Sequence, residues 1–207
     1  MLIHFDYDGV LVDSLDQLLD LAQRAQREMG AGRLPRADDF RTLGNLTLIG
    51  LGIAIGIPQE RAAEFAAETF RLLREDSRIP AFQTGICEVL ERLNRKHTLV
   101  VMTANSEEVV RKALQQSGMG AFIQAIFDGE TSDAKSEKIK ASMKNFGFTG
   151  NQTYMVGDAF SDIKEGKKAG VKTIAVTWGY QPRERLLKAI PDYIVDTPGE
   201  ILNLLER

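Results

Sequence analysis

The sequence predicts an α/β protein with a doubly wound, Rossmann-like parallel sheet and a helical domain inserted after the first strand. Short apolar runs typical of buried strands alternate with helical patterns that end at glycines. This alternation is interrupted once, early in the chain, by a long stretch in which every apolar pattern is helical. Strands that alternate with helices form parallel sheets covered on both faces, and ligands bind at the carboxyl ends of such strands.

The strands and helices of the sheet region follow from these patterns. Six apolar runs are expected to form strands: residues 2–5, 98–102, 125–127, 153–156, 172–176 and, as the weakest, 193–195. Three of the connecting helices are expected at residues 107–117, 136–146 and 161–169, each followed by a glycine that can end it.

The helical insertion contains four amphipathic patterns, at residues 15–29, 36–43, 46–55 and 59–74. Asp13 and Ser14 are expected to cap the first helix, and Pro80 is a turn signal at the other end. We therefore divide the chain into an α/β core, residues 1–13 and 82–207, and a helical cap domain, residues 14–81. The very apolar run 46–58 is shorter than the ~20 residues that cross a bilayer, so it is predicted to be a buried helix and turn.

Composition limits the classes of partner. A chain of 207 residues suffices for one α/β domain with a small accessory domain. Its net charge of -3 provides no basic surface for nucleic acid or an anionic membrane, so neither is an expected partner. Acidic residues in the opening LIHFDYD disfavour a secretory signal, and a cytoplasmic location is expected. The single cysteine, Cys87, excludes an intrachain disulfide and is expected to be a small buried residue.

Two carboxylates follow the first predicted strand, in the segment FDYDGVLVDS. Asp6 and Asp8 are one residue apart, so in an extended chain both side chains leave the same face. Gly9 supplies the backbone freedom that a tight exit from a strand needs. The alternative, two aspartates that only cap a turn, is disfavoured because apolar residues on both sides bury the segment and unpaired buried carboxylates are costly.

The fourth predicted strand runs into a second acidic pair. Asp158 follows it directly, and Asp162 lies one helical turn further on, so both can face one ion. Together with Asp6 they form a set of hard oxygen ligands that suits magnesium. The two histidines, His4 and His97, are expected to be structural or solvated.

Groups that suit an anion come from two other strand ends. The second strand ends at Thr103, where a hydroxyl and a free helix N-terminus are available, although such residues also cap helices for structural reasons. Lys135 lies just before a helix on the same side of the sheet and is the candidate cation for a phosphate dianion. Lys138, Lys140 and Lys144 on that helix are the alternative, a solvated charged face.

These segments resemble the four motifs of haloacid dehalogenase-like phosphatases. FDYDGVLVDS resembles the first motif, VVMTAN the second, Lys135 with SEKI the third, and GDAFSD with IKEGKKAG the fourth. The order and spacing agree across residues 1–13 and 82–180. The helical insertion is similar to the small cap of the phosphoglycolate phosphatase-like and β-phosphoglucomutase-like branch, and residues 177–180 resemble the loop after its fifth strand.

The resemblance implies magnesium-dependent hydrolysis of a small phosphate monoester through an aspartyl-phosphate. It makes Asp6 the nucleophile and Asp8 the general acid and base. It implies that Mg²⁺ is held by Asp6, the backbone carbonyl of Asp8, and Asp158, with Asp162 a ligand directly or through water. Thr103 and Lys135 would hold the phosphoryl oxygens. The expected partner is a small phosphorylated metabolite bound by a monomer or homodimer, and the substrate-binding set is Gly9, Thr103, Ala104, Asn105, Lys135, Arg41 and Asn45. Of these, Arg41 and Asn45 lie at a helix break in the cap, where a solvated arginine is the alternative.

The same residues disfavour most other activities known for this kind of motif. A carbon-halogen dehalogenase needs no general acid two residues after the nucleophile, yet Asp8 is present. A β-phosphoglucomutase-like mutase stays open as an alternative, although Leu18 matches the position of its usual cap histidine. A phosphonatase would need a cap lysine, and residues 14–81 contain none. A non-enzymatic phospho-acceptor module of the receiver class would lack the insertion and the late GDxxxD.

Overall fold

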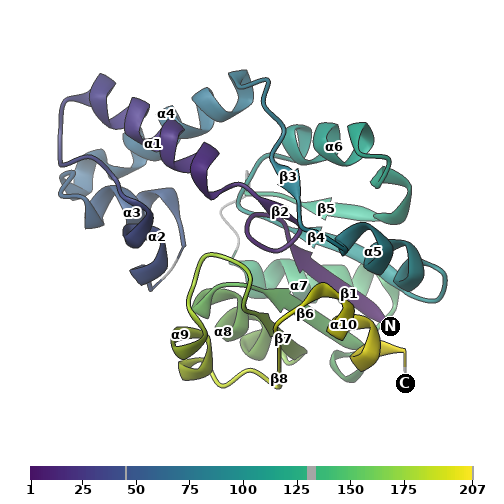
Figure 1. The fold of residues 1–207 in the computed structure, drawn as a ribbon. Helices are drawn as coiled ribbons and strands as arrows, with labels where there is room; N and C mark the ends of the chain where they lie inside the picture. Colours follow the sequence, from purple (N-terminus) through teal and green to yellow (C-terminus); the bar gives the residue numbers. More distant parts are fainter. Residues whose placement is uncertain (45, 130–133, 207) are drawn as a thin grey trace.

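The computed structural model describes residues 1–44, 46–129 and 134–206, and its centre is a parallel sheet with the strand order β5-β4-β1-β6-β7-β8 (Figure 1). The doubly wound fold predicted from the sequence is confirmed, and all six expected strands are present. They are β1 (Leu2–Asp6), β4 (Thr98–Met102), β5 (Ala125–Phe127), β6 (Thr153–Gly157), β7 (Lys172–Val176) and β8 (Tyr193–Val195). Strand β1 is central and pairs in parallel with β4 on one side and β6 on the other.

Helices cover both faces of this sheet because successive side chains of a strand point to opposite faces. Ile3 and Phe5 of β1 pack with α5, α6 and α10, whereas Leu2 packs with α7 on the other face. The core helices are α5 (Ile86–Asn94), α6 (Glu107–Gln116), α7 (Lys135–Phe146), α8 (Phe160–Ala169), α9 (Arg183–Lys188) and α10 (Pro198–Leu205), with short 3₁₀ turns η2 (Gly120–Phe122) and η3 (Gly150–Gln152).

The insertion after β1 is helical, as predicted, and packs around a hydrophobic core of its own. It consists of α1 (Leu15–Met29), α2 (Ala37–Thr42), α3 (Leu48–Ala54), the 3₁₀ turn η1 (Gln59–Arg61) and α4 (Ala62–Glu75). Leu21, Leu51 and Phe65 are fully or almost fully buried between these helices. We call α1–α4 the cap helices; Figure 1 shows them beside the sheet.

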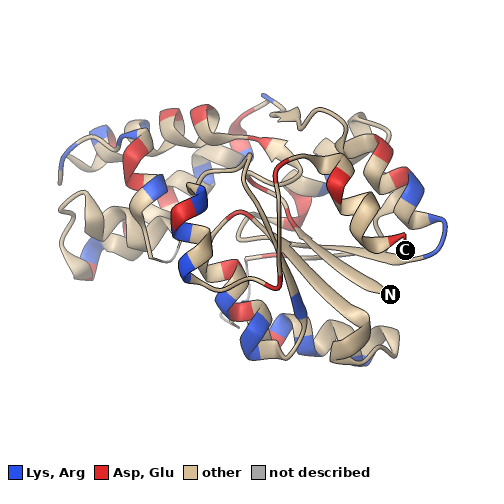
Figure 2. Ribbon diagram, turned by 60° about the horizontal axis from the view of Figure 1, so that its bottom comes forward, with Lys and Arg blue, Asp and Glu red and all other residues tan. Residues whose placement is uncertain are grey.

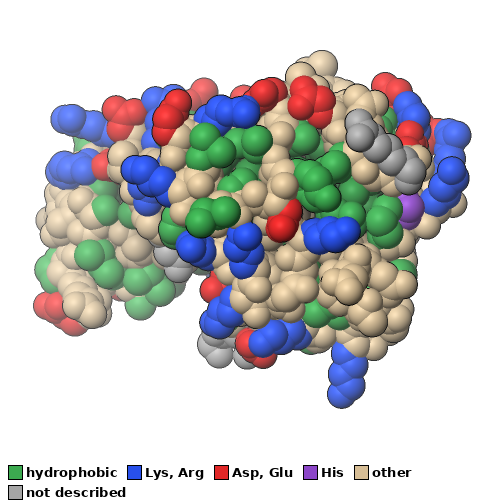
Figure 3. Space-filling view, turned by 90° about the horizontal axis from the view of Figure 1, so that it is seen from below, with side chains coloured by type: hydrophobic (Ala, Val, Ile, Leu, Met, Phe, Trp, Pro, Cys, Tyr) green, Lys and Arg blue, Asp and Glu red, His purple; other side chains and the backbone are tan. Residues whose placement is uncertain are grey.

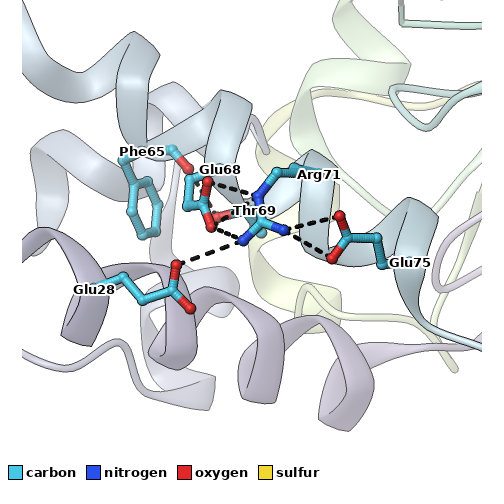
Figure 4. A network of polar contacts seen from close by, with 6 residues as sticks. All are labelled: Glu28, Phe65, Glu68, Thr69, Arg71 and Glu75. Carbon is cyan, nitrogen blue, oxygen red and sulfur yellow. Dashed lines mark hydrogen bonds and ion pairs between the residues drawn. The ribbon is translucent and has the colours of Figure 1, made fainter.

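An ion-pair network joins the two long cap helices on their outer side. Arg71 of α4 pairs with Glu75 one turn on at 2.7 Å and with Glu68 one turn before, and it reaches Glu28 of α1 at 3.5 Å (Figure 4). These side chains are mostly solvent-exposed, so each pair contributes at most about 1 kcal/mol to the free energy of unfolding. Of these pairs, the one between Arg71 and Glu28 joins α1 to α4, and the other two lie within α4.

The two ends of the insertion lie side by side in a short antiparallel ribbon that the sequence did not predict. Its strands are β2 (Val12–Asp13) and β3 (Ala81–Phe82). The chain therefore leaves the core and returns to it at one place, where we propose the boundary between the core, residues 1–13 and 82–207, and the cap domain, residues 14–81.

Two expectations about buried residues are corrected by the structure. Cys87 is exposed, because Ile86 and Val89 take the buried positions of α5 and leave Cys87 on the solvent side. The apolar run 46–58 forms the expected helix and turn, but Ile49 and Ile53 on the outer side of α3 are 46% and 48% exposed.

Charged residues lie mainly on the helices and loops, and the strands carry few of them (Figure 2). Figure 3 shows basic and acidic side chains interspersed with hydrophobic ones on one face of the molecule. No helix among the described residues is both long and apolar enough to cross a membrane.

Candidate active site

Three carboxylates meet at the carboxyl edge of the sheet. Asp6 ends β1, Asp158 follows the neighbouring strand β6, and Asp162 lies in the first turn of α8. One oxygen atom of each lies within 4.8 Å of the others, and Asp158 and Asp162 are almost completely buried. The structure thus brings together the three side chains that the sequence proposed for one ion.

The backbone at Gly9 and Tyr180 packs closely against the Asp158 carboxylate and fixes its position. Its Oδ2 atom accepts a hydrogen bond from the Tyr180 backbone N–H at 2.6 Å. Gly9 has a φ of +78°, and a Cβ at this position would lie 2.2 Å from Asp158 Oδ2. The Gly9 N–H donates to the Val12 carbonyl within its own loop. In this structure Gly9 therefore provides space for Asp158, and its N–H is bound by the Val12 carbonyl.

Lys135 lies against two of the carboxylates, as its predicted role requires. Its Nζ atom is 3.1 Å from Asp6 Oδ1 and 2.5 Å from Asp162 Oδ1. Burial acts to lower the pKa of Lys135, but the Asp162 and Asp6 carboxylates outweigh it and raise that pKa above its ordinary value. Lys135 is thus a cation at neutral pH.

Two further lysines of α7, Lys138 and Lys140, bind other groups. Lys138 donates to the carbonyl of Asp128, and Lys140 pairs with Glu137 on the same helix. Of the lysines weighed from the sequence, the one brought to the carboxylates is Lys135.

Asp8 is anchored by a chain of two hydroxyl groups. Ser14 Oγ donates to Asp8 Oδ1 at 2.6 Å, and Tyr180 Oη lies 2.6 Å from the same Ser14 oxygen. Ser14 had been expected to cap α1, but its side chain makes no capping hydrogen bond. A hydrogen bond to a carboxylate is stronger than one to a neutral amide, which explains why the Ser14 side chain binds Asp8 and does not cap α1. The linkage itself was missed, because nothing in the sequence indicates that residues 14 and 180 meet.

The loop after β4 adds polar groups beside Asp6. Thr103 Oγ1 accepts from the Asn105 N–H, and Asn105 Oδ1 accepts from the Ser106 N–H, both at 2.9 Å. Thr103 and Asn105 are buried, and Ala104 between them is exposed. All three line the same cavity as Asp6 and Asp8. Because Thr103 Oγ1 accepts from a backbone N–H, its own hydroxyl proton points elsewhere and is available to a ligand.

Burial destabilises the ionised form of these carboxyl groups and so raises their pKa values. Burial raises the pKa of Asp6 well above its usual range, opposed by Lys135. Burial and the neighbouring Asp162 raise the pKa of Asp158 to about 7. Burial also raises the pKa of Asp8, against the hydrogen bonds from Ser14 and Asn105.

This arrangement fits a divalent cation. Among the described residues, Asp158 Oδ1 is a buried oxygen without a hydrogen-bond partner. A divalent cation would use this free oxygen and offset the crowded negative charge. Carboxylate oxygens are the ligands that Mg²⁺ and similar hard ions prefer.

The carboxylates open into a cavity of about 740 Å³ between the core and the cap helices. Leu18, Leu46 and Phe70 line it from the cap, and Asp6 and Asp8 line it from the core. The structure does not bring Arg41 to this cavity. Its guanidinium donates to Asp38 at 2.9 Å on the exposed side of α2, and Asn45 lies outside the described residues.

A contact between α2 and the segment after β7 was not predicted. Gln181 and Arg185 both donate a hydrogen bond of 2.7 Å to the Leu43 carbonyl, which caps the end of α2. The rings of Phe40 and Tyr180 pack edge to face beside it, with centroids 6.2 Å apart. The Tyr180 segment therefore contacts Asp158, Asp8 through Ser14, and the cap.

Comparison with known proteins gives consistent matches. Residues 3–176 match the family model described as haloacid dehalogenase-like hydrolase. The chain is 26% identical to the phosphoglycolate phosphatase of Synechococcus elongatus, over 99% of this chain and 97% of that one. It is 24% identical to the pyrophosphatase PpaX of Bacillus velezensis, over 98% and 94%. A solved haloacid dehalogenase-like family hydrolase from Streptococcus pneumoniae superposes with a TM-score of 0.86 at 22% identity, over 98% and 97%.

Proposed function

The chain belongs to the haloacid dehalogenase-like hydrolase family and is a phosphatase, and from this premise we propose that it hydrolyses phosphate monoesters with Mg²⁺ through an aspartyl-phosphate on Asp6. The observation that carries the proposal is the position of Asp6. It lies at the base of the cavity, 3.1 Å from Lys135, with Asp8 held two residues further on. A phosphoryl group above Asp6 would meet a nucleophile, a cation and a proton donor at once.

In the first step an Asp6 oxygen attacks phosphorus while the bond from phosphorus to the leaving oxygen breaks. Asp8 donates its proton to that oxygen as the general acid. In the second step Asp8 removes a proton from water, which attacks phosphorus and releases phosphate and Asp6. The hydrogen bond from Ser14 fixes the orientation of Asp8 in both steps.

Charge on the phosphoryl group is balanced by this chain's own residues together with the metal. Lys135 and the Thr103 hydroxyl hold phosphoryl oxygens, and the loop at Ala104 and Asn105 shapes the site around them. Mg²⁺, held by Asp6, the Asp8 carbonyl and Asp158, with Asp162 a ligand directly or through water, would supply further positive charge. A small phosphorylated metabolite in the cytoplasm is the substrate class we expect.

The alternatives gain no support of their own. A β-phosphoglucomutase-like enzyme would use a cap histidine where Leu18 lines the cavity. A phospho-acceptor module needs no cavity covered by cap helices.

Hydrolysis of p-nitrophenyl phosphate tests the proposal. We expect turnover with Mg²⁺, loss of turnover in excess chelator, and recovery when Mg²⁺ is restored. Asp158→Asn should raise the Mg²⁺ concentration needed for half-maximal rate, and Asp38→Asn, at an exposed carboxylate of the cap, should not. Full activity in excess chelator contradicts the metal assignment, and no turnover of any ester with Mg²⁺ contradicts the phosphatase.

A further inference from the structure

Part of the cavity lining is apolar. Ala66, Phe70 and Leu73 line it from one face of α4, at positions i, i+4 and i+7. Val109 and Ala113 line it from α6 of the core, again one helical turn apart. A substrate group that extends between α4 and α6 thus meets hydrocarbon from both helices, beside the charged side chains of Glu108 and Lys112 on α6.

The charged side chains on the cap side of the cavity are either paired with each other or exposed to solvent. Asp76 and Arg78 both line the cavity and pair with each other at 2.6 Å. Arg74 of the cap makes no ion pair with the residues that the structure describes and is exposed to solvent, as is Lys112 across the cavity on α6 of the core. The cap side therefore presents no buried, unpaired cation to a carboxylate or a second phosphate of the substrate.

The size of the cavity also favours a large leaving group. A volume of about 740 Å³ falls within the range of about 300–1,000 Å³ that is usual for sites enclosing large organic ligands. A leaving group of two carbons would leave most of this space to water held against hydrocarbon. A bulky apolar group would displace that water and bury its own surface, which is favourable in proportion to the area covered.

From the lining, the charges and the volume we propose that the preferred substrates are phosphate monoesters with a bulky apolar alkyl or aryl leaving group, and not small anionic ones such as phosphoglycolate or pyrophosphate. This inference rests on the proposed phosphatase activity and names its substrate class. Phe70 is the residue we assign to the leaving group, because it is half-buried and lines the cavity.

The test is kcat/KM for unbranched primary alkyl phosphates from ethyl to octyl, measured beside phosphoglycolate and pyrophosphate. The acidity of the leaving alcohol is nearly constant in this series, so differences report burial of the chain. We expect kcat/KM to rise by up to about fourfold for each added methylene until the cavity is filled. Inhibition by the matching alkyl phosphonates, whose carbon–phosphorus bond is not cleaved, should strengthen with chain length and gives a binding measurement independent of turnover.

Phe70→Ala should reduce the gain per methylene in both measurements. Ile53→Ala is the matched control, since it truncates an apolar side chain that is 48% exposed on the cap and does not line the cavity. A flat series, or phosphoglycolate or pyrophosphate as the best substrate with a specific loss in Arg74→Ala, overturns this inference and leaves the phosphatase intact. No hydrolysis of any ester defeats the proposed function instead.

Discussion

Gln181 of the core donates a hydrogen bond to the Leu43 carbonyl at the end of α2, with 2.7 Å between nitrogen and oxygen. Arg185 donates to the same oxygen, also at 2.7 Å. The carbonyl that ends α2 is thus shared between two side chains of the core. This contact favours the position of the cap that covers the carboxylates.

Arg185→Met should weaken this contact while keeping an apolar side chain beside Phe160. One hydrogen bond contributes about 1 kcal/mol, so the equilibrium constant between this cap position and the others should shift about fivefold against it. We expect KM to rise severalfold with little change in kcat, and amide exchange in α2 to accelerate. Arg183→Met is the control, because Arg183 lies on the same helix as Arg185 but pairs with Asp196, the residue after β8. Equal kinetics in the two variants would show that the contact does not hold the cap.

Asp6→Asn should abolish both the phosphoryl-enzyme and turnover, because the amide cannot attack phosphorus. The fold should survive, since the amide is nearly isosteric. Asp8→Asn should lose proton transfer, typically worth about 10²–10⁴-fold. The loss should be small for the first step with aryl phosphates, whose leaving group is already acidic, and large with alkyl phosphates.

The ratio of aryl to alkyl turnover in wild type and Asp8→Asn measures this difference, with mass spectrometry to locate the phosphoryl group. An unchanged ratio, or a phosphoryl group on Asp8, would mean that the two roles are assigned wrongly.

Gly9→Ala should damage the site in a way that backbone strain alone does not explain. Gly9 and Gly118 have nearly the same left-handed φ, +78° and +77°, but a Cβ at Gly118 meets nothing within 4 Å. Gly118→Ala should therefore cost only the strain of about 1–2 kcal/mol and keep full activity. At Gly9 the added Cβ also displaces Asp158. Urea unfolding and the Mg²⁺ dependence of turnover check both effects. A wild-type Mg²⁺ dependence in Gly9→Ala would show that the position of Asp158 is not required.

Stability should fall as the pH drops below 6.5, in part because of His4. Burial lowers the pKa of His4 from 6.5 to about 4. Its Nδ1 faces the Tyr154 carbonyl, which can only accept, so Nδ1 donates and Nε2 accepts from Ser142. The unfolded chain takes up a proton below pH 6.5 that the folded chain resists until about pH 4. Across that window the fold loses about 3 kcal/mol.

Urea unfolding as a function of pH measures this loss. His4→Gln should flatten the dependence between pH 6.5 and 4, and His97→Gln should largely keep it. The same slope in His4→Gln as in wild type would exclude His4 as the cause.

The sequence predicted the parts of this structure that depend on local patterns. The strands of the sheet are continuous apolar runs, and the carboxyl ends of neighbouring parallel strands must lie together, which is why the sequence predicts Asp6 and Asp158 at one edge. The structure brings these two side chains together, and their roles stay predictions. The ribbon of β2 and β3 was missed because strands of two residues carry no periodicity. The exposure of Cys87 was missed because a shift of one position around a helix changes which side faces solvent.

The contacts that were not predicted join residues far apart in the chain. Ser14 was expected to cap a helix, and only the folded chain brings it to Asp8 and Tyr180. The same holds for Leu43 with Gln181. Neither pair follows from spacing or composition, because each depends on how the cap helices sit on the core.

The central position of β1 has a consequence for synthesis of the chain. Both of its neighbours are made much later, since β4 begins at residue 98 and β6 at residue 153. At about 5–20 residues per second, the ribosome needs roughly 8–30 s to reach β6 after completing β1. The cap helices contact one another over short sequence distances and can form during this interval. The apolar strand that ends in Asp6 has no neighbouring strand until β4 is made and only one until β6 is made, so conditions that slow translation before residue 153 should favour aggregation of the nascent protein.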